Sequence, residues 1–187
     1  DHVLASAGSE PNVAGADSFC PIPDPRIGLK STALRAGNEY VLNGAKAGFC
    51  TNAPAAKTLF VMARTDLAKP AMQSSSLFIV PSDLPGVSIG KKNHLMGWKT
   101  ALHSEVYFDN VRVPAENRIG EEGANLGLFF GQAIPYLASG LAAAYLGLAR
   151  AAYELDGGTG GIADAGERDD VVGSLVRIVG QPALKIP

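Results

Sequence analysis

The pattern of apolar and polar positions changes near residue 120. Before that point, β-branched and aromatic residues occur in short runs interrupted by Gly, Pro, Asn and Asp, as is typical of strands and turns. Residues 58–65 (TLFVMART) and 75–81 (SSLFIVP) are apolar enough to be central strands, with a loop containing Pro70 between them. Six to eight such runs without a helical period predict a mainly β fold, an antiparallel β-barrel or sandwich.

Two segments define strands and a turn more closely. Residues 29–36 (LKSTALRA) and 39–43 (EYVLN) flank Gly37-Asn38, a pair that tolerates the positive φ angles of a tight turn, so a hairpin is expected there. In residues 104–114 (SEVYFDNVRVP), Val106 and Phe108 share one face. The opposite face of that strand carries Glu105, Tyr107 and Asp109.

A second pattern begins at residue 124 and continues to about residue 156. Ala and Leu dominate there, and apolar residues recur at helical spacing until Gly157-Gly158. A helix of that length would measure about 50 Å. Pro135 should bend or split it near its first third, because proline lacks an N–H. The sequence thus predicts a β domain over residues 1–120, a long helix over 121–156, and a tail over 157–187 that favours neither strand nor helix.

Composition excludes several classes of protein. Hydrophobic residues make up 47% and charged residues 18% of the 187 residues, which is typical of a globular protein. The net charge of -2 argues against nucleic-acid binding. No apolar run reaches the roughly 18 residues of a membrane span, and residues 1–10 lack the pattern of a signal peptide, so we expect a cytoplasmic protein.

The metal-binding and redox residues form no recognisable motif. Cys20 and Cys50 match no zinc spacing, and two buried thiols in a reducing compartment are favoured over a disulfide. His2, His94 and His103 form no spaced cluster, so no metal site is predicted.

Five motifs follow one another in a recognisable order. They are SEPNVAGAD (residues 9–17), YVLNGAK (40–46), FCTN (49–52), VYFDNVRVPAENRIG (106–120) and EEG (121–123). Together they resemble the middle domain of the flavin-dependent acyl-CoA dehydrogenases, and the resemblance extends over about residues 9–155. The loop after Ser9 and the stretch 46–51 are each one residue longer than is usual in that family.

The resemblance implies FAD as cofactor and an acyl-CoA as substrate, in fatty acid metabolism. It implies that the Ser9 hydroxyl and nearby amides contact the pyrimidine edge of the flavin, that Thr51 donates near N5 and O4, and that Phe49 packs against the ring. An electron-transfer flavoprotein-type acceptor and a homo-oligomeric full-length form are further expectations of the family. Taken alone, Ser-Glu-Pro is an ordinary turn and Thr51 a good strand former.

None of the motifs that carry the resemblance contains the catalytic base of the family. Family members normally carry a helical domain before this region and a larger one after it, and the base is a Glu in the latter. In one branch the base lies on the first long helix, at a position that corresponds to about Leu137, and leucine cannot accept a proton. Glu121 and Glu122 lie nearby in a charged loop. We therefore assign no catalytic residue to this chain, and expect the match to stop near Glu154 because the chain is truncated, frameshifted or divergent there.

Two other functions stay open at this point. A flavin-dependent monooxygenase of the same architecture needs no base for an α-proton. A non-catalytic β domain used for assembly would explain both the missing base and a long apolar helix that requires partner helices.

Overall fold

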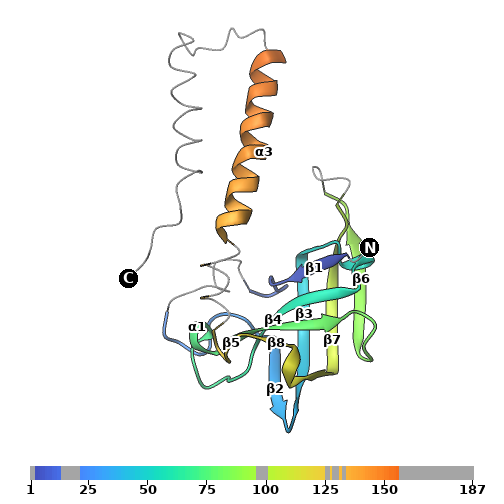
Figure 1. The fold of residues 1–187 in the computed structure, drawn as a ribbon, viewed down its shortest axis with the longest axis vertical. Helices are drawn as coiled ribbons and strands as arrows, with labels where there is room; N and C mark the ends of the chain where they lie inside the picture. The colour runs from blue at the N-terminus through green and yellow to red at the C-terminus, as the bar shows by residue number, and fades with distance from the viewer. Residues whose placement is uncertain are drawn as a thin grey trace. The chain divides into compact units, whose positions relative to one another are not determined.

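A computed structural model describes residues 3–13, 22–95, 101–124, 127, 131 and 134–155 of the chain. The chain divides into two compact units, Asp1–Leu128 and Phe129–Pro187. The first, the β unit, contains the strands, and the second contains the helix α3 (Figure 1).

The described part of the β unit contains one eight-stranded sheet. Its strands follow the order β6-β7-β3-β2-β4-β5-β8, and β1 pairs with β4 beside this path. Figure 1 shows the two longest strands, β3 and β7, side by side. The bounds are β1 Leu4–Ala7, β2 Thr32–Ala36, β3 Glu39–Thr51, β4 Thr58–Arg64, β5 Ser75–Pro81, β6 Val87–Asn93, β7 His103–Pro114 and β8 Arg118–Ile119, with short helical turns at Ala53–Ala55, Ala71–Ser74 (α1) and Ala115–Asn117.

The prediction of a mainly β fold with one long helix is confirmed, and the strand pairing adds a difference. Most neighbouring strands are antiparallel, but β1 and β2 both pair with β4 in parallel. The sheet is therefore mixed. Strands β6 and β8 end the sheet within the described residues, so the observed pairs do not close a barrel.

The predicted hairpin is present between β2 and β3. Ala36 lies opposite Glu39, which leaves Gly37 and Asn38 as a two-residue turn. Gly37 has a φ angle of +66°, the conformation for which glycine was expected at this position.

The core lies on one face of each strand, and β7 shows how this is achieved. Val106 and Phe108, which were predicted to share one face, are both buried, yet Val111 and Val113 are buried too, although they fall in the opposite phase. The register between β7 and β3 shifts in this part of β7, where Asn110 has a φ angle of +50°. Asparagine tolerates this left-handed conformation, and the irregularity returns the later valines to the core.

Helix α3 runs over Ile134–Leu155. Pro135 is the second residue of this range, so the predicted bend or split falls beside residues that the structure does not describe. Among the described α3 side chains none is buried, and Leu137, Tyr145 and Leu148 are all more than half exposed. No part of the described chain forms a helix with the length and apolar character required to cross a membrane.

Candidate functional site

Ser9 lies two residues after the end of β1, on a segment that runs beside β3. Its side chain is half-buried, and its carbonyl oxygen accepts a hydrogen bond from the N–H of Ala47 at 3.1 Å. Since Ala47 and Thr51 belong to the same strand, no more than about 13 Å of strand separates their Cα atoms. Two of the predicted contact residues, far apart in sequence, are thus brought to one strand.

A buried ion pair fixes the Ser9 segment in this position. The ammonium of Lys46 on β3 lies 2.7 Å from Oε1 of Glu10, and the two side chains are 0% and 2% exposed. Lys46 also donates to the carbonyl oxygen of Gly8 at 3.2 Å. Residues on both sides of Ser9 are therefore bound to the same lysine.

Backbone donors complete the shell around Glu10. Its Oε2 accepts the N–H of Lys30 at 2.6 Å, and its Oε1 accepts the N–H of Ser31 at 3.0 Å. Because donors reach both oxygens, the arrangement favours the ionised carboxylate. Burial raises the pKa of Glu10, but Lys46 and these hydrogen bonds lower it by more, so the pKa lies below its ordinary value. Burial lowers the pKa of Lys46, and Glu10 counteracts part of that change.

Gly44 lets β3 approach the segment that binds Glu10. Its φ angle is +140°, and a Cβ atom built on it would lie 2.8 Å from the Cα of Ser31. Any side chain at this position would push Ser31 away from β3. The glycine of the YVLNGAK motif is thus required by a close approach of two backbone segments.

Strand β3 is irregular between this ion pair and Thr51. Lys46 pairs with Val106 and Cys50 with Ser104, so that four steps along β3 match two along β7. This bulge lies in residues 46–51, which the sequence resemblance predicts to be one residue longer than usual, and bulges commonly redirect side chains beside functional sites. Cys50 is buried within it as a free thiol, and burial raises its pKa to about 11.

Thr51 ends β3 opposite the first residue of β7, His103. The Thr51 hydroxyl lies 3.2 Å from Nδ1 of His103, and His103 is 7% exposed. By the alternation along β7, His103 lies on the face away from Val106 and Phe108. Thr51 is therefore not directed into the hydrocarbon core but is hydrogen-bonded to a covered imidazole.

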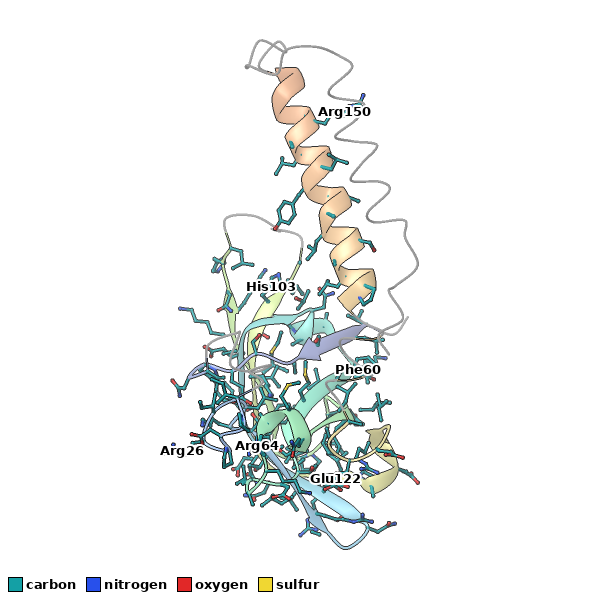
Figure 2. The ribbon with its side chains drawn as sticks, turned by 90° about the vertical axis from the view of Figure 1, so that its left-hand side faces the viewer. Arg26, Phe60, Arg64, His103, Glu122 and Arg150 are labelled. Carbon is teal, nitrogen blue, oxygen red and sulfur yellow. The ribbon has the colours of Figure 1, made fainter. Side chains whose placement is uncertain are left out.

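The other predicted residues have different outcomes. Phe49 belongs to β3, but its side chain lies outside what the structure describes, as does Cys20. Glu122 accepts a hydrogen bond from the buried Tyr40 hydroxyl at 2.7 Å, and Arg118 lies 3.7 Å from it. Figure 2 shows Glu122 and His103 at opposite ends of the β unit. The contacts of Glu122 are structural, and it lies away from Thr51.

Comparison with known proteins now defines the family. The family model "Acyl-CoA dehydrogenase, middle domain" matches residues 6–111, which contain Ser9 and all of β3. The chain belongs to the acyl-CoA dehydrogenase family. The part of the family fold that it matches is the part that carries the site described above.

Individual relatives support the same family assignment. A cyclohexane-1-carbonyl-CoA dehydrogenase of Geobacter metallireducens is 44% identical over 94 residues, which are 50% of this chain and 24% of that protein. A probable medium-chain specific acyl-CoA dehydrogenase of Caenorhabditis briggsae is 36% identical over 152 residues, 78% of this chain and 36% of that protein. The chain thus spans between about a quarter and about a third of the length of these relatives.

Solved structures give the same result for the fold. A glutaryl-coenzyme A dehydrogenase in complex with glutaryl-CoA superposes with a TM-score of 0.68 at 29% identity, over 80% of this chain and 35% of that one. The FAD complex of PigA superposes with a TM-score of 0.60 at 29% identity, over 71% of this chain and 32% of that one.

Three residues of the site were missed by sequence reasoning. Glu10 and Lys46 lie inside quoted motifs, but a charged residue in sequence is usually on the surface, and nothing in the pattern pairs two residues 36 positions apart. His103 was considered only as a metal ligand. Its contact with Thr51 depends on the register of β3 against β7, which the sequence does not specify.

Proposed function

We propose that this chain supplies the flavin- and acyl-CoA-binding face of an FAD-dependent acyl-CoA dehydrogenase that oxidises the Cα–Cβ bond of a thioester. The observation that carries the proposal is the buried Glu10–Lys46 pair, which holds the Ser9 segment on the strand that ends in Thr51. An isolated surface turn would not need such a pair. Family membership and a solved FAD complex among the structural relatives support it.

The residues present fit a flavin in their chemistry. When bound, FAD would accept the hydride that leaves the β-carbon, at its N5 atom. Ser9 offers a half-buried hydroxyl on a segment fixed from both sides, for the pyrimidine edge. Thr51 offers a second hydroxyl at the end of β3, for the region of N5 and O4. Fixed donors of this kind stabilise charge where it develops, without having to reorganise.

We assign the base that removes the α-proton to a residue outside this chain. Leu137, at the position where one branch of the family carries it, has no acidic group and is 53% exposed on α3. Glu122 is bound by Tyr40 and Arg118. We extend the proposal to an acyl-CoA substrate, an electron-transfer flavoprotein-type acceptor and a homo-oligomeric full-length enzyme.

A titration with FAD, followed by its absorbance and fluorescence, tests the proposal. Wild-type protein should bind FAD, and Ser9→Ala and Thr51→Val should each weaken binding about three- to tenfold, as expected for one lost hydrogen bond. Ser88→Ala on the exposed edge strand β6 is the matched control and should bind like wild type. Protein that leaves the absorbance and fluorescence of added FAD unchanged would contradict the proposal.

A panel of acyl-CoAs then separates binding from turnover. Addition of an acyl-CoA should perturb the spectrum of the bound flavin without bleaching it, because no base is assigned to this chain. Bleaching by an acyl-CoA alone would show that a base is present after all. A panel that leaves the spectrum unchanged would contradict the acyl-CoA part of the proposal.

A further inference from the structure

The carboxylate of Glu10 joins three segments that are distant in sequence. Glu10 lies on the segment after β1, and its Oε1 accepts a hydrogen bond from the Lys46 ammonium on β3 at 2.7 Å. Its two oxygens also accept the backbone N–H groups of Lys30 and Ser31, at 2.6 Å and 3.0 Å. Because Glu10 directly follows Ser9, this carboxylate can determine where Ser9 is held.

The chemistry of the three donors fixes the direction of these bonds. A backbone N–H and an ammonium can only donate, so both oxygens of Glu10 must accept. Oε1 binds Lys46 and Ser31, and Oε2 binds Lys30. A glutamine side chain has nearly the same shape but only one oxygen, so its NH₂ group would face at least one of these donors. Only the ionised carboxylate therefore satisfies all three, and a buried donor left without an acceptor is costly.

Ser9 itself depends on backbone contacts for its position. Its hydroxyl makes no hydrogen bond to another residue that the structure describes, whereas its carbonyl oxygen accepts the N–H of Ala47 at 3.1 Å. The hydroxyl is thus available to a ligand. What holds it in place is the backbone bond to Ala47 and the anchored side chain of the next residue, Glu10.

We propose that Glu10 is a positioning residue, whose ionised carboxylate holds Ser9 against β3 so that the Ser9 hydroxyl binds the pyrimidine edge of the flavin. This inference rests on the proposed function, in which Ser9 makes that contact. The Glu10 side chain is 2% exposed, so it acts through Ser9 and not by a contact of its own with the flavin. The role is local to the site and distinct from a contribution to the stability of the whole β unit.

Hydrogen exchange of the backbone amides tests the local role without any cofactor. The reporter is the N–H of Ala47, which binds Ser9 and makes no contact with Glu10. In Glu10→Gln this amide should exchange at least about tenfold faster, as expected when hydrogen bonds to a charged group are lost. The amides that pair β4 with β5 are the internal control, and their exchange should change much less.

A double-mutant cycle with FAD tests the functional consequence. Glu10→Gln should weaken FAD binding about tenfold, because Ser9 is no longer held in place. In a Ser9→Ala background, the further effect of Glu10→Gln should shrink to about threefold or less. The matched control is Glu39→Gln, which removes an exposed ion pair with Arg112 at the other end of β3 and should leave FAD binding unchanged.

A second substitution covers the case in which Glu10→Gln does not fold. Glu10→Asp keeps the negative charge but shortens the side chain by one methylene group, so it cannot reach all three donors from the same backbone position. It should speed the exchange of Ala47 and weaken FAD binding, each by less than Glu10→Gln is expected to. Wild-type exchange and affinity in Glu10→Asp would contradict the proposal.

The outcomes separate the inference from the proposed function. Exchange of Ala47 that rises no more than that of the β4–β5 amides would show that Glu10 only stabilises the fold, and would overturn the inference. An undiminished effect of Glu10→Gln in the Ser9→Ala background would overturn it as well. Wild-type protein that binds no FAD would refute the proposed function, and the exchange of Ala47 would then still decide whether Glu10 holds Ser9 in place.

Discussion

The β unit and helix α3 differ in how their apolar side chains are covered. In the β unit, one face each of β3, β4, β5 and β7 contributes to a core of nearly inaccessible residues, including Leu59, Val61 and Phe78. In α3, none of the described side chains is buried, and three large apolar ones are more than half exposed. The candidate site therefore lies in the part of the chain that contains its own hydrophobic core. An apolar helix, by contrast, requires a partner to bury its surface.

The largest effect on the stability of the β unit is expected when its buried ion pair is disrupted. Lys46→Met should lower the free energy of unfolding by about 3–5 kcal/mol, because it leaves the Glu10 carboxylate buried without its cation. Lys91→Met on the exposed edge strand β6 is the matched control and should change it by less than about 0.5 kcal/mol. Urea denaturation measures both. The double variant Glu10→Gln/Lys46→Met should recover part of the loss, and no recovery would show that Lys46 acts mainly through packing.

The same ion pair predicts that the stability of the folded protein depends on pH. The pKa of Glu10 is lowered in the folded protein, so its contribution to stability is fully present above the unfolded-state value of about 4.3. That contribution is lost as the pH falls through the lower folded-state pKa. Unfolding measured from pH 7 down to pH 3 should therefore show a loss of stability in acid that is smaller in Glu10→Gln/Lys46→Met. Identical acid profiles would exclude Glu10 as a source of this dependence.

A smaller loss of stability is expected from a substitution at the point where two backbone segments of the β unit meet. Gly44→Ala should cost about 1–3 kcal/mol, because the new Cβ would collide with Ser31 and because φ is positive. Gly37→Ala is an informative control, since its φ is also positive but no atom lies within 4 Å of a built Cβ. The excess loss of Gly44→Ala over Gly37→Ala measures the close approach together with the less favourable φ of +140° at Gly44. Equal losses would contradict a cost from the close approach.

The smallest effect is expected in α3. Leu148→Ser should change the stability of the β unit by less than about 0.5 kcal/mol, because the side chain is 66% exposed. Phe78→Ala, in the core, should by contrast cost about 3–5 kcal/mol. Denaturation followed by the β-sheet signal in circular dichroism compares the two. A large effect of Leu148→Ser would show that α3 is covered in solution and contributes to the stability of the whole chain.

Sequence reasoning recovered the parts of the fold that depend on local pattern. Strands β4, β5 and β7 were predicted because their apolar runs are long and bounded by turn residues, and the hairpin at Gly37 because a tight turn requires positive φ. Strand β1 was not predicted, since four residues carry too little pattern and its partner β4 lies 54 positions away at Leu4 and Thr58. The phase change at Asn110 was missed because alternation alone cannot reveal a bulge.

The candidate site was predicted only in part, because a sequence pattern reveals local motifs but not contacts between distant segments. Ser9 and Thr51 came from motifs, and the structure places Ser9 beside β3 and Thr51 at its end. Their roles toward FAD stay predictions. The residues that hold them, Glu10, Lys46 and His103, come from pairings between distant segments, which only the folded register brings together.

The short parallel strand β1 has a consequence for how cofactor and chain influence each other. Only four residues attach it to β4, and Ser9 follows two positions later. If such a strand opens locally, its amide protons exchange with solvent while the rest of the sheet stays closed. A ligand that binds Ser9 only in the closed form would slow that exchange, and in the same measure the energy needed to close β1 would reduce the affinity of the ligand.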